Sequence, residues 1–353
     1  MRILNVGDFN WMTGRERDTA NVDLFAIRQK LSRAAIRAGH MVVEFSDRAV
    51  SRTSAPLRLR GLGVKASNQA FLNMVEEVRP ELILLNFADD IANDSLQAAR
   101  RLSPGVTIVD INIDPLPDPK TRSRLELRRG AVDALFVTTA GEGLRGLAGA
   151  GAFAAFMPNP VDAAVETGRA FETSAPTVDL IFPAGDDSLR QIGGERVRPS
   201  EAVARLSAGL PGLRLATPGL GQPKLRGQAY FEALNGARLG WALSRHNDQP
   251  LYASDRMAHM LGSGLATLLD RRTGFERFYA EDEAVFYDGL DDLVGRVRTL
   301  LADDGLRREI ARRGWTRTWA VFEAGRVFDY LMQQLFRDGG AGGFEWPCDR
   351  WSA

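Results

Sequence analysis

The sequence is poor in the residues from which cysteine- and histidine-based sites are built. Its 353 residues include one cysteine, Cys348, and three histidines, His40, His246 and His259. A single cysteine excludes an internal disulfide and a cysteine-based zinc site. So few histidines also argue against a histidine-rich metal centre. We therefore expect neither a bound metal nor a resident cofactor.

Long hydrophobic runs and targeting signals are missing as well. No apolar run approaches the ~18 residues that a membrane span needs, and the nearest, residues 147–157, is short and rich in Gly and Ala. The chain reaches an acidic residue, Asp8, too early for a signal peptide. We therefore expect a cytoplasmic protein, with peripheral attachment to the inner membrane face as the alternative.

Neither sign of charge is in excess, because Lys+Arg and Asp+Glu both number 45. A dedicated nucleic-acid binder normally shows a basic excess, so we expect no nucleic-acid partner. Hydrophobic residues make up 44% and charged residues 25% of the chain, which excludes a disordered, collagen-like or coiled-coil protein. At roughly 100–200 residues per domain, the length predicts two domains, each with its own core.

The first half alternates short apolar runs with amphipathic stretches. The apolar runs predict strands over residues 3–6, 41–45, 82–85, 106–111, 132–137 and 153–157. Helical periodicity and helix-end signals predict helices over residues 23–38, 71–78, 95–102, 120–129 and 142–147. Strands that are apolar throughout, with helices between them, are typical of a parallel sheet covered on both faces.

A second alternating series follows a polar, Ala-rich stretch over residues 161–176, which we interpret as a linker. Strands are expected over residues 178–182, 213–216, 237–243, 264–269 and 284–287, and the chain then becomes helical. We predict an α/β fold with two Rossmann-like domains that face a cleft. Their expected extents are residues 1–165 and 166–338, meeting near residues 160–178, with an irregular tail over residues 339–353. The alternative is that the C-terminal helices cross back to the first domain.

Common nucleotide-binding and hydrolase motifs are absent. Residues 7–14, which follow the first strand, do not match GxGxxG, and Gly149-Ala150-Gly151 precedes a strand instead of following one. Neither a Walker A sequence nor a GxSxG elbow occurs. Ordinary dehydrogenases, kinases and hydrolases are therefore disfavoured. In doubly wound sheets, ligands bind outside the carboxyl ends of the strands, where Asp8 and Asp114 lie in this sequence.

Residues 255–269, DRMAHMLGSGLATLL, resemble the donor-site stretch of the GT-B glycosyltransferases. More narrowly, they resemble the spore-maturation-protein (CgeB-like) family, in which an Arg opens a helix and a turn of small residues ending in Gly leads to a buried strand. Residues 39–42 (GHMV), 133–138 (DALFVT) and 156–162 (FMPNPVD) are similar to further segments of that family, in the same order. The resemblance touches nearly the whole chain.

This resemblance implies a glycosyltransferase that moves a sugar from a nucleotide-sugar donor to an unidentified acceptor: a glycan, a lipid or a protein. The second domain would hold the donor and the first the acceptor. Arg256 lies in the first turn of a helix expected to begin after Ser254, which suits a diphosphate. Further expected donor contacts are Arg190, where the family places an Arg, Lys224 in a Gly- and Pro-rich loop, and the turn Gly262, Ser263 and Gly264.

The sequence departs from the GT-B pattern at two positions. Many retaining GT-B enzymes carry two Glu residues eight positions apart, and here Leu251 and His259 stand in their places. One hypothesis is that His259 has taken over the contact with the donor sugar; the alternative is a packed helix histidine. The missing carboxylates favour two further alternatives, a non-catalytic protein that binds a sugar nucleotide or a partner, and a sugar-nucleotide epimerase.

Transfer to a hydroxyl acceptor needs a base, and Asp8 and Asp114 are the candidates, with turn or cap roles as the alternative. The stretch between Asp47 and Glu76 contains five basic and no acidic residues: Arg48, Arg52, Arg58, Arg60 and Lys65. The resemblance makes it a loop of the acceptor-side domain. It is then expected either to meet an anionic or membrane-associated acceptor or to be a solvated basic loop.

Overall fold

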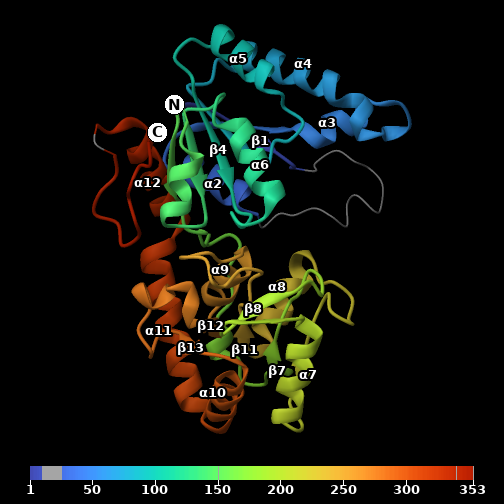
Figure 1. Ribbon diagram of the computed structural model, residues 1–353, viewed down its shortest axis with the longest axis vertical. Coiled ribbons are helices and arrows are strands. Elements are labelled where there is room, and N and C mark those ends of the chain that lie inside the picture. The colour runs from blue at the N-terminus through green and yellow to red at the C-terminus, as the bar shows by residue number, and fades with distance from the viewer. Residues whose placement is uncertain (10–25, 150, 339, 353) are drawn as a thin grey trace. The chain divides into compact units, whose positions relative to one another are not determined.

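The computed structural model describes residues 1–9, 26–149, 151–338 and 340–352 (Figure 1). The chain divides into two compact units. Unit 1 comprises residues 1–137, 141–158 and 324–353, and unit 2 comprises residues 138–140 and 159–323. Each unit is built on its own parallel sheet, which confirms the predicted α/β fold of two Rossmann-like domains. The start of the helix predicted over residues 23–38 and parts of segments 7–14 and 149–151 lie outside the described residues.

Unit 1 contains a six-stranded parallel sheet in the order β2-β1-β3-β4-β5-β6. The strands are β1 (Arg2–Gly7), β2 (Met41–Ser46), β3 (Leu82–Asn86), β4 (Thr107–Asn112), β5 (Ala134–Val137) and β6 (Phe153–Phe156). From β1 the chain adds β2 on one side and β3 on the other, so the strand order reverses between β1 and β3. Asp8 directly follows β1 at this switch point, where doubly wound sheets form a ligand crevice.

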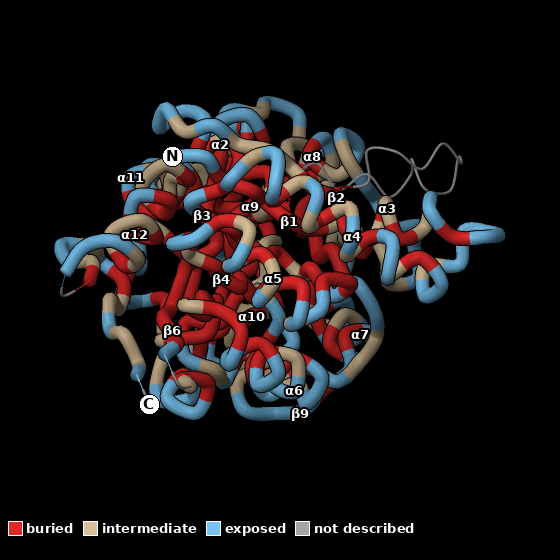
Figure 2. Tube along the Cα trace, turned by 90° about the horizontal axis from the view of Figure 1, so that it is seen from above, coloured by how far each residue is buried: buried red, intermediate tan, exposed pale blue. Residues whose placement is uncertain are grey.

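The helices of unit 1 pack in two groups. They are α2 (Ile27–Arg37), α3 (Asp47–Thr53), α4 (Arg60–Val78), α5 (Asn93–Leu102), α6 (Pro119–Arg128) and α12 (Ala324–Phe336), with short 3₁₀ turns η1 (Pro56–Arg58) and η2 (Glu142–Leu147). α2 packs on α12, and α4 packs on both α3 and α5. The inner strands β3 and β5 are buried throughout, because helices shield the sheet from water. The edge strand β2 is partly exposed, and the tube in Figure 2 shows the buried interior of the sheet.

The basic stretch of residues 47–76 is helical, not a loop as the resemblance implied. α3 and α4 cross at Gly63, where an added Cβ would lie 1.7 Å from the carbonyl oxygen of Ser51, so no side chain fits there. The hydroxyl of Ser67 donates to the carbonyl of Asp47 across the same contact (2.9 Å). Two glycines near the start of α4, Gly61 and Gly63, have low helix propensity and hide this helix in the sequence pattern.

The domain boundaries differ from those expected at residues 165 and 338. α12 was assigned to the second domain, but its Tyr330 hydroxyl donates to the carbonyl of Phe156 at the end of β6 (2.7 Å), and it belongs to unit 1. The tail follows it: Trp351 pairs antiparallel with Ala154, and Trp346 packs edge-on against Tyr330. Burial of these rings returns the end of the chain to the first sheet, which is the alternative in which the C-terminal helices cross back.

Unit 2 contains a five-stranded parallel sheet in the order β10-β7-β11-β12-β13. The strands are β7 (Val178–Ile181), β10 (Leu215–Ala216), β11 (Ala237–Trp241), β12 (Ala266–Asp270) and β13 (Val285–Tyr287), and an antiparallel pair, β8 (Arg190–Ile192) and β9 (Glu195–Val197), follows β7. The sequence pattern did not predict this pair. The strand order reverses between β7 and β11, so the expected ligand position in unit 2 is outside the ends of these two strands.

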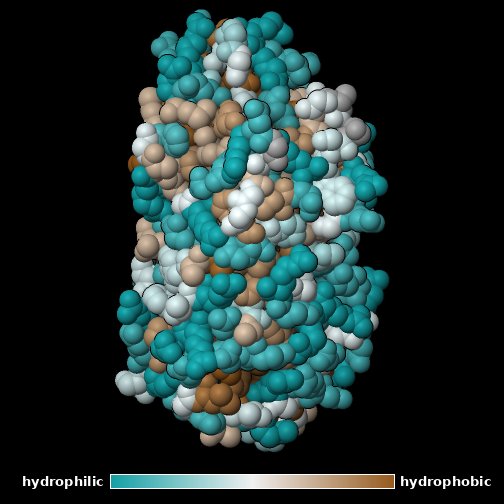
Figure 3. All heavy atoms as spheres, turned by 90° about the vertical axis from the view of Figure 1, so that its left-hand side faces the viewer, coloured by the Kyte–Doolittle hydropathy of each residue, from teal (hydrophilic) through white to brown (hydrophobic). Residues whose placement is uncertain are grey.

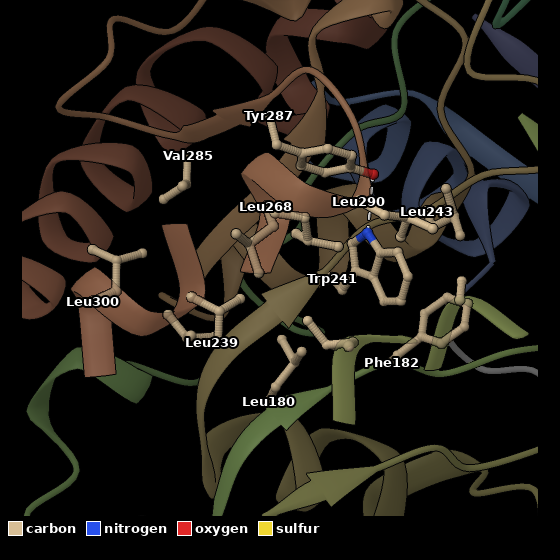
Figure 4. Close-up of a cluster of buried hydrophobic side chains, with 14 of the residues drawn as sticks. Leu180, Phe182, Leu239, Trp241, Leu243, Leu268, Val285, Tyr287, Leu290 and Leu300 are labelled. Atoms are coloured by element: carbon tan, nitrogen blue, oxygen red, sulfur yellow. Dashed lines mark hydrogen bonds between the residues drawn. The ribbon is translucent and has the colours of Figure 1, made fainter. Parts of the chain in front are cut away.

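Helices and a buried aromatic cluster complete unit 2. The helices are α7 (Pro199–Gly209), α8 (Gly227–Asn235), α9 (Asp255–Gly262), α10 (Leu290–Ala302) and α11 (Asp304–Phe322), with 3₁₀ turns η3 (Ala170–Glu172), η4 (Arg271–Thr273) and η5 (Phe275–Arg277). In the core, the indole of Trp241 donates to the hydroxyl of Tyr287 (2.9 Å) and packs against Phe182 (Figure 4). This hydrogen bond gives the buried indole N–H and the buried phenolic oxygen a partner.

The surface matches the balanced composition. On the face drawn in Figure 3, hydrophilic side chains predominate and hydrophobic ones form small groups. Within the described ranges, no helix combines the length and hydrophobicity that a membrane crossing requires.

Candidate functional site

A small open pocket lies at the switch point of unit 2. The loop after β7 forms one wall, and the loop before α8 and the first turn of α9 form the others. Its lining residues are Pro183, Ala184, Gly185, Pro218, Lys224, Leu225, Arg226, Tyr230 and Arg256. Because the pocket sits beyond the carboxyl ends of β7 and β11, it occupies the position at which parallel sheets bind ligands.

Two arginines converge beside this pocket. Arg190 Nη1 donates to the carbonyl oxygen of Leu243 (2.9 Å), and Arg256 Nη2 donates to the same oxygen (3.2 Å). Leu243 lies just beyond the end of β11, Arg190 opens β8, and Arg256 is in the first turn of α9. The structure thus brings together two residues that the sequence separates by 66 positions and that we had assigned to one donor site.

The local electrostatics favour an anion. Arg190 is 4% exposed, and burial, followed by the nearby charge of Arg256, lowers the pKa of its guanidinium to about 10. Asp186 is the carboxylate nearest to it (3.8 Å), and that carboxylate is also bound by Arg245 (3.0 Å). Asp186 is therefore shared, and two like charges remain close together at Leu243. A bound phosphate would relieve this repulsion.

Several hydrogen-bond donors around the pocket are buried without a partner. They are the Nε atoms of Arg190 and Arg256 and the hydroxyl of Tyr230, each unpaired within the part of the chain that the structure describes. The residue preceding α9, Ser254, has N-cap geometry, but its side chain does not cap the helix. Helix N-termini and unpaired guanidinium N–H groups are what a phosphate group binds. The site is built for an anionic ligand.

The loop that carries Lys224 is fixed against the β7 loop. Ala184 N donates to the carbonyl of Pro218 (3.0 Å), and Gly219, at φ +89°, approaches so closely that an added Cβ would lie 2.0 Å from the oxygen of Ala184. A glycine is required here by both backbone conformation and contact. Lys224 itself is exposed and lines the pocket, so its ammonium group can reach a ligand there.

The Gly262-Ser263-Gly264 turn, the third expected part of the donor site, lies elsewhere. It follows the last residues of α9, about 10 Å along the helix axis from Arg256 at 1.5 Å per residue. An added Cβ at Gly262 would contact Val161 and Glu166, and one at Gly264 would contact Phe171. These contacts give the turn a packing role: small residues allow residues 161–171 to cross the end of α9.

His259 is buried behind Tyr230 and does not line the pocket. Its ring lies 5.6 Å from that of Tyr230 and 5.3 Å from that of Phe231, and its Nε2 is 3.6 Å from Oε1 of Glu166. Glu166 was not among the predicted site residues, because it lies in the stretch interpreted as a linker. Its burial and its approach to α9 arise from tertiary packing, and no local signal marks it.

The two candidate bases lie in unit 1. β1 and β4, the strands that precede Asp8 and Asp114, are separated in the sheet by β3, so their ends are about 10 Å apart. Asp8 faces Arg48 (3.6 Å), whose Nη2 also donates to Asp89 (2.7 Å). Asp114 is exposed. Both carboxylates lie at the carboxyl edge of the sheet, as expected. They do not form one site, because Asp8 faces Arg48 and Asp114 lies beyond a different strand.

Acidic pairs that could be mistaken for a metal site have other partners. The carboxylate of Asp187 accepts hydrogen bonds from the amide and the hydroxyl of Ser200 in the first turn of α7, and Asp186 accepts from Ser188. In the described ranges, no cluster of three or more His, Cys, Asp or Glu residues has the arrangement of a metal site.

One family model matches part of this chain. Residues 196–333 match the family model described as "Glycosyl transferase-like", a segment that runs from β9 into α12 and includes α9 and Arg256. This segment is therefore similar to glycosyltransferases. No curated protein sequence matches it. The matched segment includes residues 255–269, which carry the resemblance described above.

Solved structures of GT-B proteins share the fold of this chain along almost its whole length. Sucrose-phosphate synthase from Thermosynechococcus elongatus is similar with a TM-score of 0.58 and 14% identity, covering 96% of this chain and 98% of that one. HepE from Anabaena, in complex with UDP-glucose, has a TM-score of 0.58 and 11% identity, covering 95% and 99%. AviGT4, a glycosyltransferase involved in avilamycin A biosynthesis, has a TM-score of 0.58 and 12% identity, covering 95% and 97%.

The placement of His259 leads to an expected result for its removal. His259→Ala deletes a ring packed against two aromatic side chains and leaves Glu166 facing a void. We expect the melting temperature to fall, by an amount corresponding to about 2–3 kcal/mol of unfolding free energy. Thermal denaturation measures this. An unchanged melting temperature together with lost turnover would instead support the hypothesis that His259 contacts the donor sugar.

Proposed function

We propose that this glycosyltransferase takes its sugar from a uridine diphosphate sugar held in the unit 2 pocket. The observation that carries the proposal is the convergence of Arg190 and Arg256 on the carbonyl of Leu243. The known complexes of HepE with UDP and UDP-glucose support uridine as the nucleoside. In this assignment the two guanidinium groups and the start of α9 bind the diphosphate, and Lys224 adds a charge from the facing loop.

The same groups stabilise the departing diphosphate. The acceptor hydroxyl oxygen bonds to the anomeric carbon, and the bond from that carbon to the diphosphate oxygen breaks. Its electron pair leaves with UDP, and the hydroxyl proton passes to a base. Positive charge placed where negative charge develops lowers the barrier. Asp8 and Asp114 are our candidates for the base, and the acceptor is a glycan, lipid or protein held by unit 1.

The finer assignments belong to the same proposal. We assign the chain to the CgeB-like group on the strength of residues 255–269 and the segments that accompany them in order. We place the protein in the cytoplasm, where nucleotide sugars would be its substrates. Neither assignment is needed for the binding chemistry described above.

The test is calorimetry of the full chain with UDP, ADP and GDP, followed by turnover assays with UDP-sugars. We expect UDP to bind and to raise the melting temperature, because a ligand that binds the folded state stabilises it. Asp8→Asn and Asp114→Asn should leave UDP affinity unchanged, and the variant that removes the base should lose transfer. No binding of any nucleoside diphosphate would overturn the proposal.

A non-catalytic role is the second candidate, favoured by the side chains at the positions of the missing Glu pair. Leu251 is buried at φ +55°, and His259 lies behind Tyr230, so neither position supplies a carboxylate to the pocket. If the protein is non-catalytic, we expect it to bind UDP-sugars and to release no UDP with any acceptor tested. Measuring UDP release alongside binding separates the two candidates.

A further inference from the structure

The connection between α3 and α4 exposes a group of leucines. Leu57 is 86% exposed, Leu59 54% and Leu62 66%. These three exposed leucines fall within six residues of the chain. Figures 1 and 2 both place this connection at the outer end of the helix pair, away from the strands of unit 1. We call residues 53–62 the leucine tip.

The tip is held in shape by its supporting helices. The contact of Gly63 with the backbone of Ser51 locks α4 onto α3 directly behind the tip. Arg60 makes paired hydrogen bonds to Asp90 (2.7–3.0 Å), which ties the start of α4 to the loop after β3. Leu57 and Arg58 both have positive φ, at 54° and 55°. Non-glycine residues adopt this conformation at a cost, so the fold maintains the outward position of Leu57.

The surroundings of the leucines are cationic. Between Asp47 and Glu76 the chain has five basic residues and no acidic ones. Arg48 and Arg60 pair with aspartates of the neighbouring loop. Arg58 is exposed on the tip, and Lys65 is exposed on the next turn of α4. Exposed apolar side chains flanked by exposed cations are complementary to one surface above others, an anionic lipid bilayer.

We propose that the leucine tip docks unit 1 on anionic membranes. The leucines enter the boundary between headgroups and acyl chains, and Arg58 and Lys65 remain at the level of the lipid phosphates. Apolar insertion and electrostatic attraction each contribute part of the binding, as for other peripheral proteins. This inference goes beyond the proposed function: it concerns a surface of unit 1 and does not depend on the donor.

The experiment is vesicle co-sedimentation of the full chain. The probes are vesicles of phosphatidylcholine alone and of equal parts phosphatidylcholine and phosphatidylglycerol, at low and high salt. We expect binding to the anionic vesicles, weaker binding at high salt because screening acts on the charges alone, and little binding to phosphatidylcholine. Absence of binding to the anionic vesicles overturns the proposal.

Two variants test the tip itself. In the first, Leu57→Asn, Leu59→Ser and Leu62→Ser are combined, with Asn chosen because it tolerates positive φ. We expect anionic-vesicle binding to fall at least about tenfold, since each leucine contributes apolar burial. In the second, Arg58→Asn and Lys65→Gln are combined. Each lost charge should weaken binding about fivefold, and the residual binding should depend less on salt than that of the wild type.

Matched controls keep the result specific. Leu127→Ser removes an equally exposed leucine (69%) from α6 of the same unit, and Arg101→Gln with Lys120→Gln removes two exposed cations from α5 and α6; neither should change vesicle binding. Equal loss in a control overturns the assignment to the tip. So does a leucine-tip variant that keeps its vesicle binding but changes the oligomeric state in gel filtration, which would make the tip a contact with a second copy. Dextran sulfate is the last probe. If the wild type does not bind vesicles and the leucine-tip variant still binds soluble dextran sulfate, the cations would be assigned to a polysaccharide instead.

Discussion

Replacing Arg256 by glutamine is expected to lower UDP affinity by about tenfold to a hundredfold, because a hydrogen bond to a charged group contributes roughly 1.5–3 kcal/mol. The guanidinium of Arg256 shares the carbonyl of Leu243 with Arg190, and its Nε is buried without a partner among the described residues. The UDP affinity of Arg256→Lys should fall between those of the wild type and Arg256→Gln, since lysine keeps the charge and loses the planar guanidinium group. Isothermal titration calorimetry measures all three proteins.

The ligand-free protein supplies an independent check of this result. Removing one of two close positive charges relieves repulsion, so we expect the melting temperature of Arg256→Gln without UDP to stay level or rise slightly. The increase that UDP produces should shrink in the variant. Arg277→Gln, an exposed arginine of unit 2 that does not line the pocket, is the matched control. Unchanged UDP affinity in Arg256→Gln would remove this residue from the site.

Asp110→Ala is expected to destabilise unit 1 by about 3–5 kcal/mol, the typical effect of leaving a buried charge without its partner. Asp110 is fully buried in β4 and accepts two hydrogen bonds from Arg124 (3.1 Å each). Arg128, also buried, approaches from 3.7 Å and donates to the carbonyls of Ala88 and Ile91. Neither arginine can follow the lost carboxylate, because both are held in place by other partners.

Glu126→Ala on α6 is the matched control for this second effect. Glu126 also pairs with an arginine, Arg122 (3.1 Å), but both side chains are about half exposed, and surface pairs contribute at most about 1 kcal/mol. Urea denaturation followed by circular dichroism compares the two variants. Similar midpoints for Asp110→Ala and Glu126→Ala would contradict the buried-pair interpretation. Asp110→Asn should lose less than Asp110→Ala, because the amide retains an acceptor for Arg124.

Much of the fold follows from local pattern. Continuous apolar runs such as residues 82–85 and 106–111 can be satisfied only in a sheet covered on both faces, and helices between them require parallel strands. The predicted strands of both units are found within a few residues of their expected limits. Local pattern failed where the helix signal was weak, as in α4 with Gly61 and Gly63 near its start, because propensity and periodicity there oppose a helix that tertiary contacts stabilise.

The candidate site was predictable in part. The position of Arg256 follows from a helix start, and Asp8 from a strand end, both of which are local features of the sequence. Strand order is not local: the pairing of β7 with β11 puts the ends of these two strands side by side, and the sequence carries no direct record of it. The same holds for the approach of Glu166 to His259, which joins a presumed linker to a helix.

The sequence by itself therefore determined the class of the fold, the absence of cysteine chemistry and the residue types available to bind a diphosphate, because composition and periodicity act within a few residues. The tertiary structure decided which of those residues meet. It joined Arg190 to Arg256 on one carbonyl, placed the Gly262-Ser263-Gly264 turn at the far end of α9, and returned α12 to unit 1. Such contacts depend on strand order and on burial between segments far apart in the chain, where local propensity has no influence.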